Sequence, residues 1–162
     1  MKRHSTRRRQ SGLTTVEFAI IGSLAMILVF GVIEMARAIF VLNALTEATR
    51  RGARIAVVCP VNDPAIAEVA IFNSSGGGST SPIIHGFDTS DIRLSYLDLG
   101  GVVIEDPVTD FGNIRYIEVS VVNFQHELLI PFANFTFTMP ELATTLPRES
   151  LGVPRSGVIT SC

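Results

Sequence analysis

An uninterrupted apolar stretch near the N-terminus constrains this chain more than any other feature. Residues 13–33 read LTTVEFAIIGSLAMILVFGVI, a run of 21 residues in which Glu17 is the single charge. A helix rises 1.5 Å per residue, so this run spans roughly 31 Å, about the hydrocarbon thickness of a bilayer. The sequence therefore predicts a transmembrane helix over 13–33. The alternative is a buried helix of a soluble protein.

The formal net charge of −2 hides a strong segregation of charge along the chain. Everything after position 12 carries eight Lys and Arg against 15 Asp and Glu, a formal charge of −7. The leading segment holds the other five basic residues, which are Lys2, Arg3, Arg7, Arg8 and Arg9. Basic residues beside a span stay in the cytoplasm, so we expect an inner-membrane protein with a cytoplasmic N-terminus and a periplasmic C-terminal body. The near-neutral total argues against nucleic acid as a partner.

Glu17 is an expensive residue for a membrane helix. A carboxylate within an apolar span costs about 2.5–3.5 kcal/mol on insertion scales, so its partner should be sought. Glu17 lies only about one turn inside the run, and it can also reach the lipid headgroups. Position alone leaves these two interpretations open.

The residues around Glu17 favour a partner. The string Gly12-Leu13-Thr14-Thr15-Val16-Glu17-Phe18 resembles the class III signal of type IV pilin-like proteins. This resemblance implies cleavage by a prepilin peptidase between Gly12 and Leu13, with the hydrophobic helix retained. It also implies that Glu17, followed by Phe18, serves assembly by pairing with the Leu13 amine of a neighbouring subunit. Such a pair is favourable in a medium of low dielectric constant and fixes the register between helices.

A longer pattern points to one family of these proteins. The chain has Val16-Glu17-Phe18-Ala19, then an unbroken apolar run, then Glu34 and Arg37, and a Thr, Ala and Arg-rich stretch over 46–54. Together these features resemble the TadE-like minor pilins of the tight adherence (Tad) pilus, over about residues 7–58. The resemblance implies a structural protein, not an enzyme, needed for pilus assembly and adherence. Its implied partners are a prepilin peptidase, other pilins and the inner membrane, with possible incorporation into the extracellular pilus.

Two rival functions remain open. A pseudopilin of a type II secretion system shares the same signal and anchor. Ala36-Arg37-Ala38 also fits the A-x-A pattern of an ordinary signal peptide, which would release a periplasmic binding or enzymatic domain after Ala38. The apolar run is longer than the usual signal-peptide core, which disfavours this second rival.

The helical pattern continues beyond the predicted span. Small or apolar residues recur at three- and four-residue spacings over 34–58, with Phe40 and Val41 opening the stripe and Glu34 and Arg37 on the polar face. Pro60 stops the pattern. We expect one helix over 13–58, in which 34–58 is amphipathic and buries its stripe against a globular domain.

The remaining chain, 59–162, predicts an extracytoplasmic α+β domain. Asp63 and Pro64 start a short helix over 64–72. Strand patterns cover 92–99, 102–104, 115–124 and 134–139, and the later prolines indicate loops. We expect a pilin-like α+β fold: a long N-terminal transmembrane and stalk helix with a small antiparallel sheet packed on its C-terminal half. The first 12 residues form the basic leader.

Candidate binding chemistry in this domain is sparse. Cys59 and Cys162 can form an intramolecular disulfide outside the cytoplasm, and the alternatives are free thiols or an intermolecular bond. Two cysteines alone make no zinc site, and no cofactor fingerprint appears in the sequence. The loop acids can bind calcium or be plain solvated charges; they are Asp98, Glu105, Asp106 and Asp110.

Overall fold

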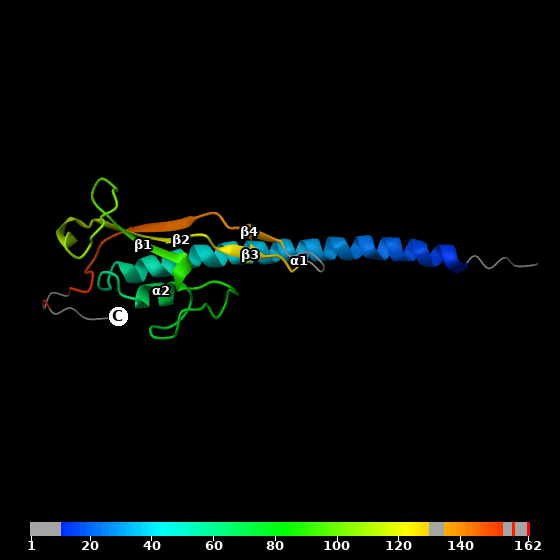
Figure 1. The fold of residues 1–162 in the computed structure, drawn as a ribbon, viewed down its shortest axis with the longest axis horizontal. Helices are drawn as coiled ribbons and strands as arrows, with labels where there is room; N and C mark the ends of the chain where they lie inside the picture. Colours follow the sequence, from blue (N-terminus) through cyan, green and yellow to red (C-terminus); the bar gives the residue numbers. More distant parts are fainter. Residues whose placement is uncertain (1–10, 130–134, 154–156, 158–161) are drawn as a thin grey trace, which may run out of the picture.

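The structure is a computed structural model that describes residues 11–129, 135–153, 157 and 162. One long helix, α1 (Ser11–Ala56), runs the length of the molecule, and every other element gathers around its C-terminal half (Figure 1). The expected α+β architecture is confirmed: a long apolar helix with a small antiparallel sheet packed against it.

The sequence of α1 explains why it stays unbroken. It contains no proline over its 46 residues, and an 18-residue window within Gly12–Ala56 has a mean hydropathy of 2.5. None of that window is buried inside the protein, and the helix is long and apolar enough to cross a membrane. It ends at position 56, two residues earlier than expected. Just beyond the helix end, the segment 149–152 donates hydrogen bonds to the carbonyls of Val57 and Val58.

The main sheet has three antiparallel strands in the order β1-β2-β5. They are β1 (Ile92–Leu97), β2 (Tyr116–Val121) and β5 (Leu142–Pro147). Strand β2 is central, and its alternate residues Ile117, Val119 and Val121 are buried toward the core. The helix packs against β2 and β5, and the Thr49 and Thr144 hydroxyls join α1 to β5 at 2.8 Å.

Close packing between α1 and the sheet depends on small residues. The alanines at 48, 53 and 56 of α1 are fully buried, and so is the larger Leu45. A Cβ added at Gly52 would lie 2.9 Å from Val119 Cγ1 and 3.0 Å from the Ala70 Cβ. The absence of a side chain there lets the helix approach both the sheet and the short helix α2 (Ala65–Ala70).

The short helix α2 is shorter than the expected range of 64–72. The N-cap is Pro64, one residue later than the expected Asp63, although the Asp63 side chain accepts a hydrogen bond from the Ala65 N–H at 2.9 Å. Phe72 has a φ of 69°, which is incompatible with a right-handed helix, so the element stops before it. Two 3-10 turns complete the helical content, η1 (Thr89–Asp91) and η2 (Phe111–Asn113).

Several strand predictions need correction. The expected strand 102–104 is only a single bridge between Leu97 and Val103. The expected strand 115–124 is shorter and is observed as β2 (Tyr116–Val121), because Asn123 has a φ of 58° and interrupts the extended chain before β3 (Gln125–Glu127). The expected strand 134–139 is observed as β4 (Thr136–Thr138), and position 134 lies outside the described residues. Strand β5 falls in a region predicted as loop.

Strands β3 and β4 form a two-stranded antiparallel hairpin beside the middle of α1 (Figure 1). Phe124 and Met139, just outside the two strands, pack in one cluster with Val41 of α1. Further along, the Leu129 N–H donates a hydrogen bond to Glu34 Oε1 at 3.2 Å. The hairpin therefore runs along α1 from the level of Val41 back toward Glu34, the end of the predicted span.

Candidate functional site

The proposed processing point lies at the start of α1. Gly12 and Leu13 occupy the first turn, since the helix begins at position 11. A Cβ on Gly12 would meet nothing within 4 Å, and Leu13 is exposed. The first N–H groups of a helix have no intrahelical partners, so this turn is the easiest part of α1 to unwind. The peptide bond is thus open to an approaching protein. Residues 1–10 of the leader lie outside the described residues.

Glu17 and Phe18 lie one turn further along, and both are exposed. Within the described residues, Glu17 makes no hydrogen bond and no ion pair. Leu13 and Glu17 are four residues apart and so share a face of the helix, about 6 Å apart along its axis. The carboxylate is therefore available to a partner outside this chain.

A second polar group on α1 lies where the apolar run ends, and the sequence analysis placed it wrongly. Glu34, expected on the solvated face, is only 8% exposed because the β3–β4 hairpin covers it. Its Oε1 accepts hydrogen bonds from Arg37 Nη1 at 2.6 Å and from the Leu129 N–H at 3.2 Å. Phe40, expected on the buried stripe, is exposed. The two errors have one cause: the hairpin covers a different face of this part of α1.

His126 completes this buried group, and the sequence analysis missed it. Its Nε2 atom lies 3.7 Å from Glu34 Oε1, and its ring packs edge-on against Phe137 with centroids 5.2 Å apart. His126 is 3% exposed, and its Nε2 has no hydrogen-bond partner among the described residues. A histidine in a short strand carries no sequence signal that would place it beside a glutamate 92 positions earlier. Glu34, Arg37 and His126 form what we call the buried triad, in which Glu34 and His126 are buried and the Arg37 side chain reaches the surface.

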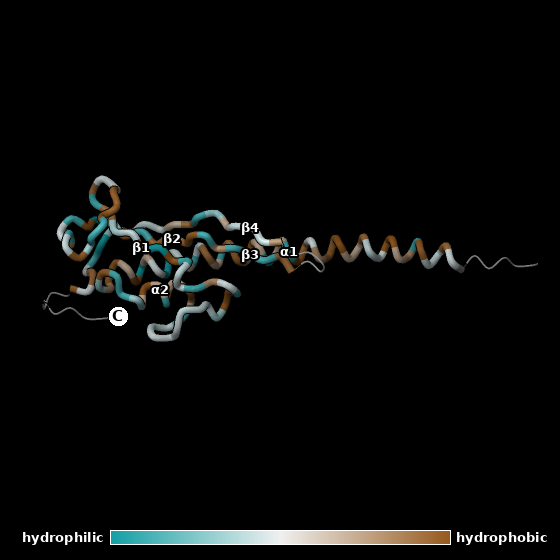
Figure 2. Tube along the Cα trace, in the orientation of Figure 1, coloured by the Kyte–Doolittle hydropathy of each residue, from teal (hydrophilic) through white to brown (hydrophobic). Residues whose placement is uncertain are grey.

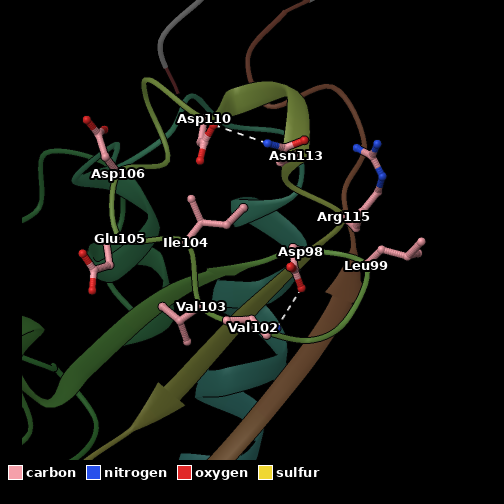
Figure 3. A pocket seen from close by; sticks show the side chains of 10 residues that line it. All are labelled: Asp98, Leu99, Val102, Val103, Ile104, Glu105, Asp106, Asp110, Asn113 and Arg115. Atoms are coloured by element: carbon pink, nitrogen blue, oxygen red, sulfur yellow. Dashed lines mark hydrogen bonds between the residues drawn. The ribbon is translucent and has the colours of Figure 1, made fainter.

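The acidic loops lie at the opposite end of the body, around a pocket of about 640 Å³ that the four loop acids help to line. Figure 3 shows Glu105 and Asp106 pointing away from Asp98. Asp98 Oδ1 already accepts hydrogen bonds from the N–H groups of Gly100 and Val102, each at 2.8 Å. Within the described residues, no group of three or more His, Cys, Asp or Glu side chains is arranged to hold a metal ion.

Local turn geometry accounts for Asp106 and Asp110 as well. The Thr109 hydroxyl donates a hydrogen bond to the Asp106 carboxylate and lowers its pKa, and the Thr109 and Val108 N–H groups act in the same direction. The Asn113 side chain donates to Asp110 at 3.3 Å (Figure 3). These carboxylates hold their own loops in shape.

The two cysteines are joined by a disulfide, with their Cα atoms 5.7 Å apart. Cys59 is fully buried just beyond α1, and the Cys162 N–H donates a hydrogen bond to Asp63 Oδ2 at 3.2 Å. The bond ties the last residue to the end of the long helix. Of the three alternatives that the sequence allows, the structure has the intramolecular disulfide rather than free thiols or an intermolecular bond.

Comparison with known proteins gives one match. Residues 12–54 match the family model described as TadE-like protein. No curated protein and no solved structure matches the chain. The matched range starts at the proposed processing point, includes Glu17, Glu34 and Arg37, and stops two residues before α1 ends. The resemblance stated from the sequence is thus confirmed over residues 12–54, which lie within α1.

Proposed function

We propose that this chain is a structural subunit, a minor pilin of a Tad-type pilus. The observation that carries this proposal is the TadE-like match, because it covers almost the whole of α1. In the proposal the chain is made as a precursor and a prepilin peptidase cleaves it between Gly12 and Leu13. The retained helix anchors it in the inner membrane, and the subunit supports pilus assembly and adherence without enzymatic activity.

The proposed topology places the basic leader in the cytoplasm and the body outside it. Five basic residues precede the span, which favours a cytoplasmic N-terminus. The Cys59–Cys162 disulfide supports the same orientation, because disulfides persist in oxidising compartments such as the periplasm.

The rival functions receive less support. A type II secretion pseudopilin shares the signal, but the family match favours the Tad pilus. Cleavage after Ala38 would cut α1 in the middle of a continuous helix and separate the Glu34–Arg37 ion pair from the body. A protein released in that way would lose most of the TadE-like segment.

The processing step can be tested by producing the full chain together with a prepilin peptidase and sequencing the mature N-terminus. We expect the mature chain to begin at Leu13. Gly12→Leu should block cleavage, because the peptidase must approach the backbone closely at this position. Ser11→Ala serves as the neighbouring control and should be cleaved. A mature N-terminus at any other position would overturn the proposal.

The assembly step depends on the charge of Glu17. We expect Glu17→Ala and the isosteric Glu17→Gln to be cleaved normally but to assemble poorly, because neither can neutralise an amine inside the membrane. Glu47→Ala, an exposed acid on the same helix, is the matched control. The measurement is the amount of subunit recovered in sheared pili relative to the amount in the membrane. Normal recovery of Glu17→Gln would rule out the proposed ion pair.

A further inference from the structure

The described residues that flank the β3–β4 connection, Leu129 and Phe135, are exposed and apolar, and we call this pair the hairpin end. Leu129 is 70% exposed and Phe135 is 60% exposed, while Phe137 is partly covered by His126. The Leu129 backbone is fixed to Glu34, the first charged residue after the apolar run. Leu129 therefore has a defined height along α1, and the Leu128 N–H, which donates to the Phe135 carbonyl at 2.9 Å, places Phe135 beside it.

The outer surface of α1 stays apolar past the predicted end of the span. Met35, Ile39 and Phe40 are all exposed, and Figure 2 shows hydrophobic residues along α1 up to the hairpin. The segment 13–40 measures about 42 Å at 1.5 Å per residue. This length exceeds a hydrocarbon core of about 30 Å but matches the roughly 40–45 Å of a bilayer with its interfacial regions. The hairpin end then falls in the outer interfacial region.

Two of the titratable groups at this height are buried, while Glu127 stays exposed and the Arg37 side chain is 36% exposed. Arg37 pairs with Glu34, and the hairpin buries both Glu34 and His126. The chain has Glu34, Arg37, His126 and Glu127 here, and Leu129 and Phe135 are exposed beside them. Paired polar groups inside and exposed Phe and Leu outside are the arrangement expected at a lipid surface.

We propose that the end of the β3–β4 hairpin, through Leu129 and Phe135, inserts into the interfacial region of the bilayer beside the span. This inference rests on the proposed membrane anchor and adds a second contact to it. With two points of attachment, the body rests on the membrane at a fixed height and tilt before the subunit is taken into a filament.

Lipid suits this surface better than a second protein does. Leu129 lines the same cavity as Phe40, whose exposed ring extends the apolar surface of α1 that lipid surrounds in the proposed anchor. Two exposed side chains fall far short of the roughly 800 Å² that each partner buries in a stable protein interface. A shallow apolar contact is instead sufficient for an interfacial segment that is already tethered by a span.

The chain contains no tryptophan, so single-tryptophan variants of the full-length protein report their own surroundings. The test positions are Phe135→Trp and Leu129→Trp. Leu28→Trp, exposed in the middle of the span, is the lipid control, and Val103→Trp, exposed at the far end of the body, is the aqueous control. Each variant is reconstituted into phosphatidylglycerol–phosphatidylcholine vesicles in which the phosphatidylcholine acyl chains are brominated, and fluorescence quenching is measured.

At the two hairpin positions, we expect quenching of at least about half that of Leu28→Trp, as for an interfacial segment. This quenching should be several-fold greater than the quenching of Val103→Trp. Hairpin quenching equal to that of Val103→Trp, with Leu28→Trp quenched, would overturn the hairpin contact and leave the anchor in place. A hairpin tryptophan shielded from both brominated lipid and aqueous iodide would show that protein covers it, and would also overturn the proposal. Loss of quenching at Leu28→Trp would instead refute the membrane anchor itself.

Discussion

At the scale of single residues, Glu34 lies in an environment very different from the one expected from the sequence around it. It is the first charged residue after the apolar run 13–33 and belongs to the amphipathic segment 34–58. Helical periodicity therefore places it on the polar, solvated face. Its actual partners include the Leu129 amide and the His126 ring, more than 90 positions later. Helical periodicity depends only on neighbours along the helix. The exposure of Glu17 could therefore be predicted, but the burial of Glu34 under a distant hairpin could not.

The buried triad gives a prediction at the same scale. Glu34→Ala should leave Arg37 without its partner and remove the part-buried hydrogen bond of the Leu129 amide, which is worth about 1.5–3 kcal/mol because its acceptor is charged. Hydrogen exchange of the Leu129 amide in detergent-solubilised protein measures the effect, and exchange should become faster. Glu34→Gln retains an acceptor oxygen and should protect this amide much better than alanine does.

The matched control for Glu34→Ala is Glu47→Ala, an exposed acid of α1 that should leave Leu129 exchange unchanged. Equal exchange in Glu34→Ala and the unmodified protein would mean that the hairpin does not depend on Glu34 for its place on α1.

At the scale of elements, the long helix and the central strand were predictable because each carries its own periodic signal. Strand β2 shows strict alternation, and α1 is long and free of proline. Strand β5 was missed because Pro140 and Pro147 suggested a loop. It lies at an edge of the sheet and pairs only with β2, and an edge strand tolerates a terminal proline.

The contact between α1 and the sheet gives an element-scale prediction at Gly52. Alanine improves helix propensity by about 1 kcal/mol over glycine, but overpacking a tight site costs about 1–3 kcal/mol. The added Cβ would lie 2.9 Å from Val119 Cγ1 and 3.0 Å from the Ala70 Cβ, so the packing loss should dominate. We expect Gly52→Ala to lower the melting temperature and Gly52→Val to lower it further.

The control for this pair is Gly22→Ala, where an added Cβ meets nothing within 4 Å. Thermal unfolding followed by circular dichroism in one detergent compares the three variants. If Gly52→Ala melts as high as Gly22→Ala, the helix can move away from the sheet without cost.

At the scale of the whole molecule, the N-terminal half of α1 packs against none of the described residues, whereas the body wraps the C-terminal half. This division was predictable because hydropathy changes character near residue 34. How the body closes on itself was not predictable, since that depends on the last residues returning to the end of α1. Leu151 is buried there, and the Glu149 and Leu151 N–H groups both donate to the Val57 carbonyl.

The disulfide gives the prediction for the whole molecule. It links positions 103 residues apart, and the chain-entropy model gives roughly 4–5 kcal/mol for a loop of this size. Cys162→Ser should remove this stabilisation while the body stays folded, since segment 149–152 still binds the end of α1. Cys59→Ser breaks the same bond but also places a hydroxyl in a fully buried site, so it should cost about 1–3 kcal/mol more.

Urea unfolding of detergent-solubilised protein, with and without a reducing agent, separates these contributions. Reduction should bring the unmodified protein close to Cys162→Ser and leave Cys162→Ser itself unchanged. Cys59→Ala should lie between the two serine variants, because it breaks the disulfide without burying a polar group. Equal stability of the oxidised and reduced protein would show that the contacts of 149–152 alone hold the C-terminal segment on α1, with the disulfide adding nothing.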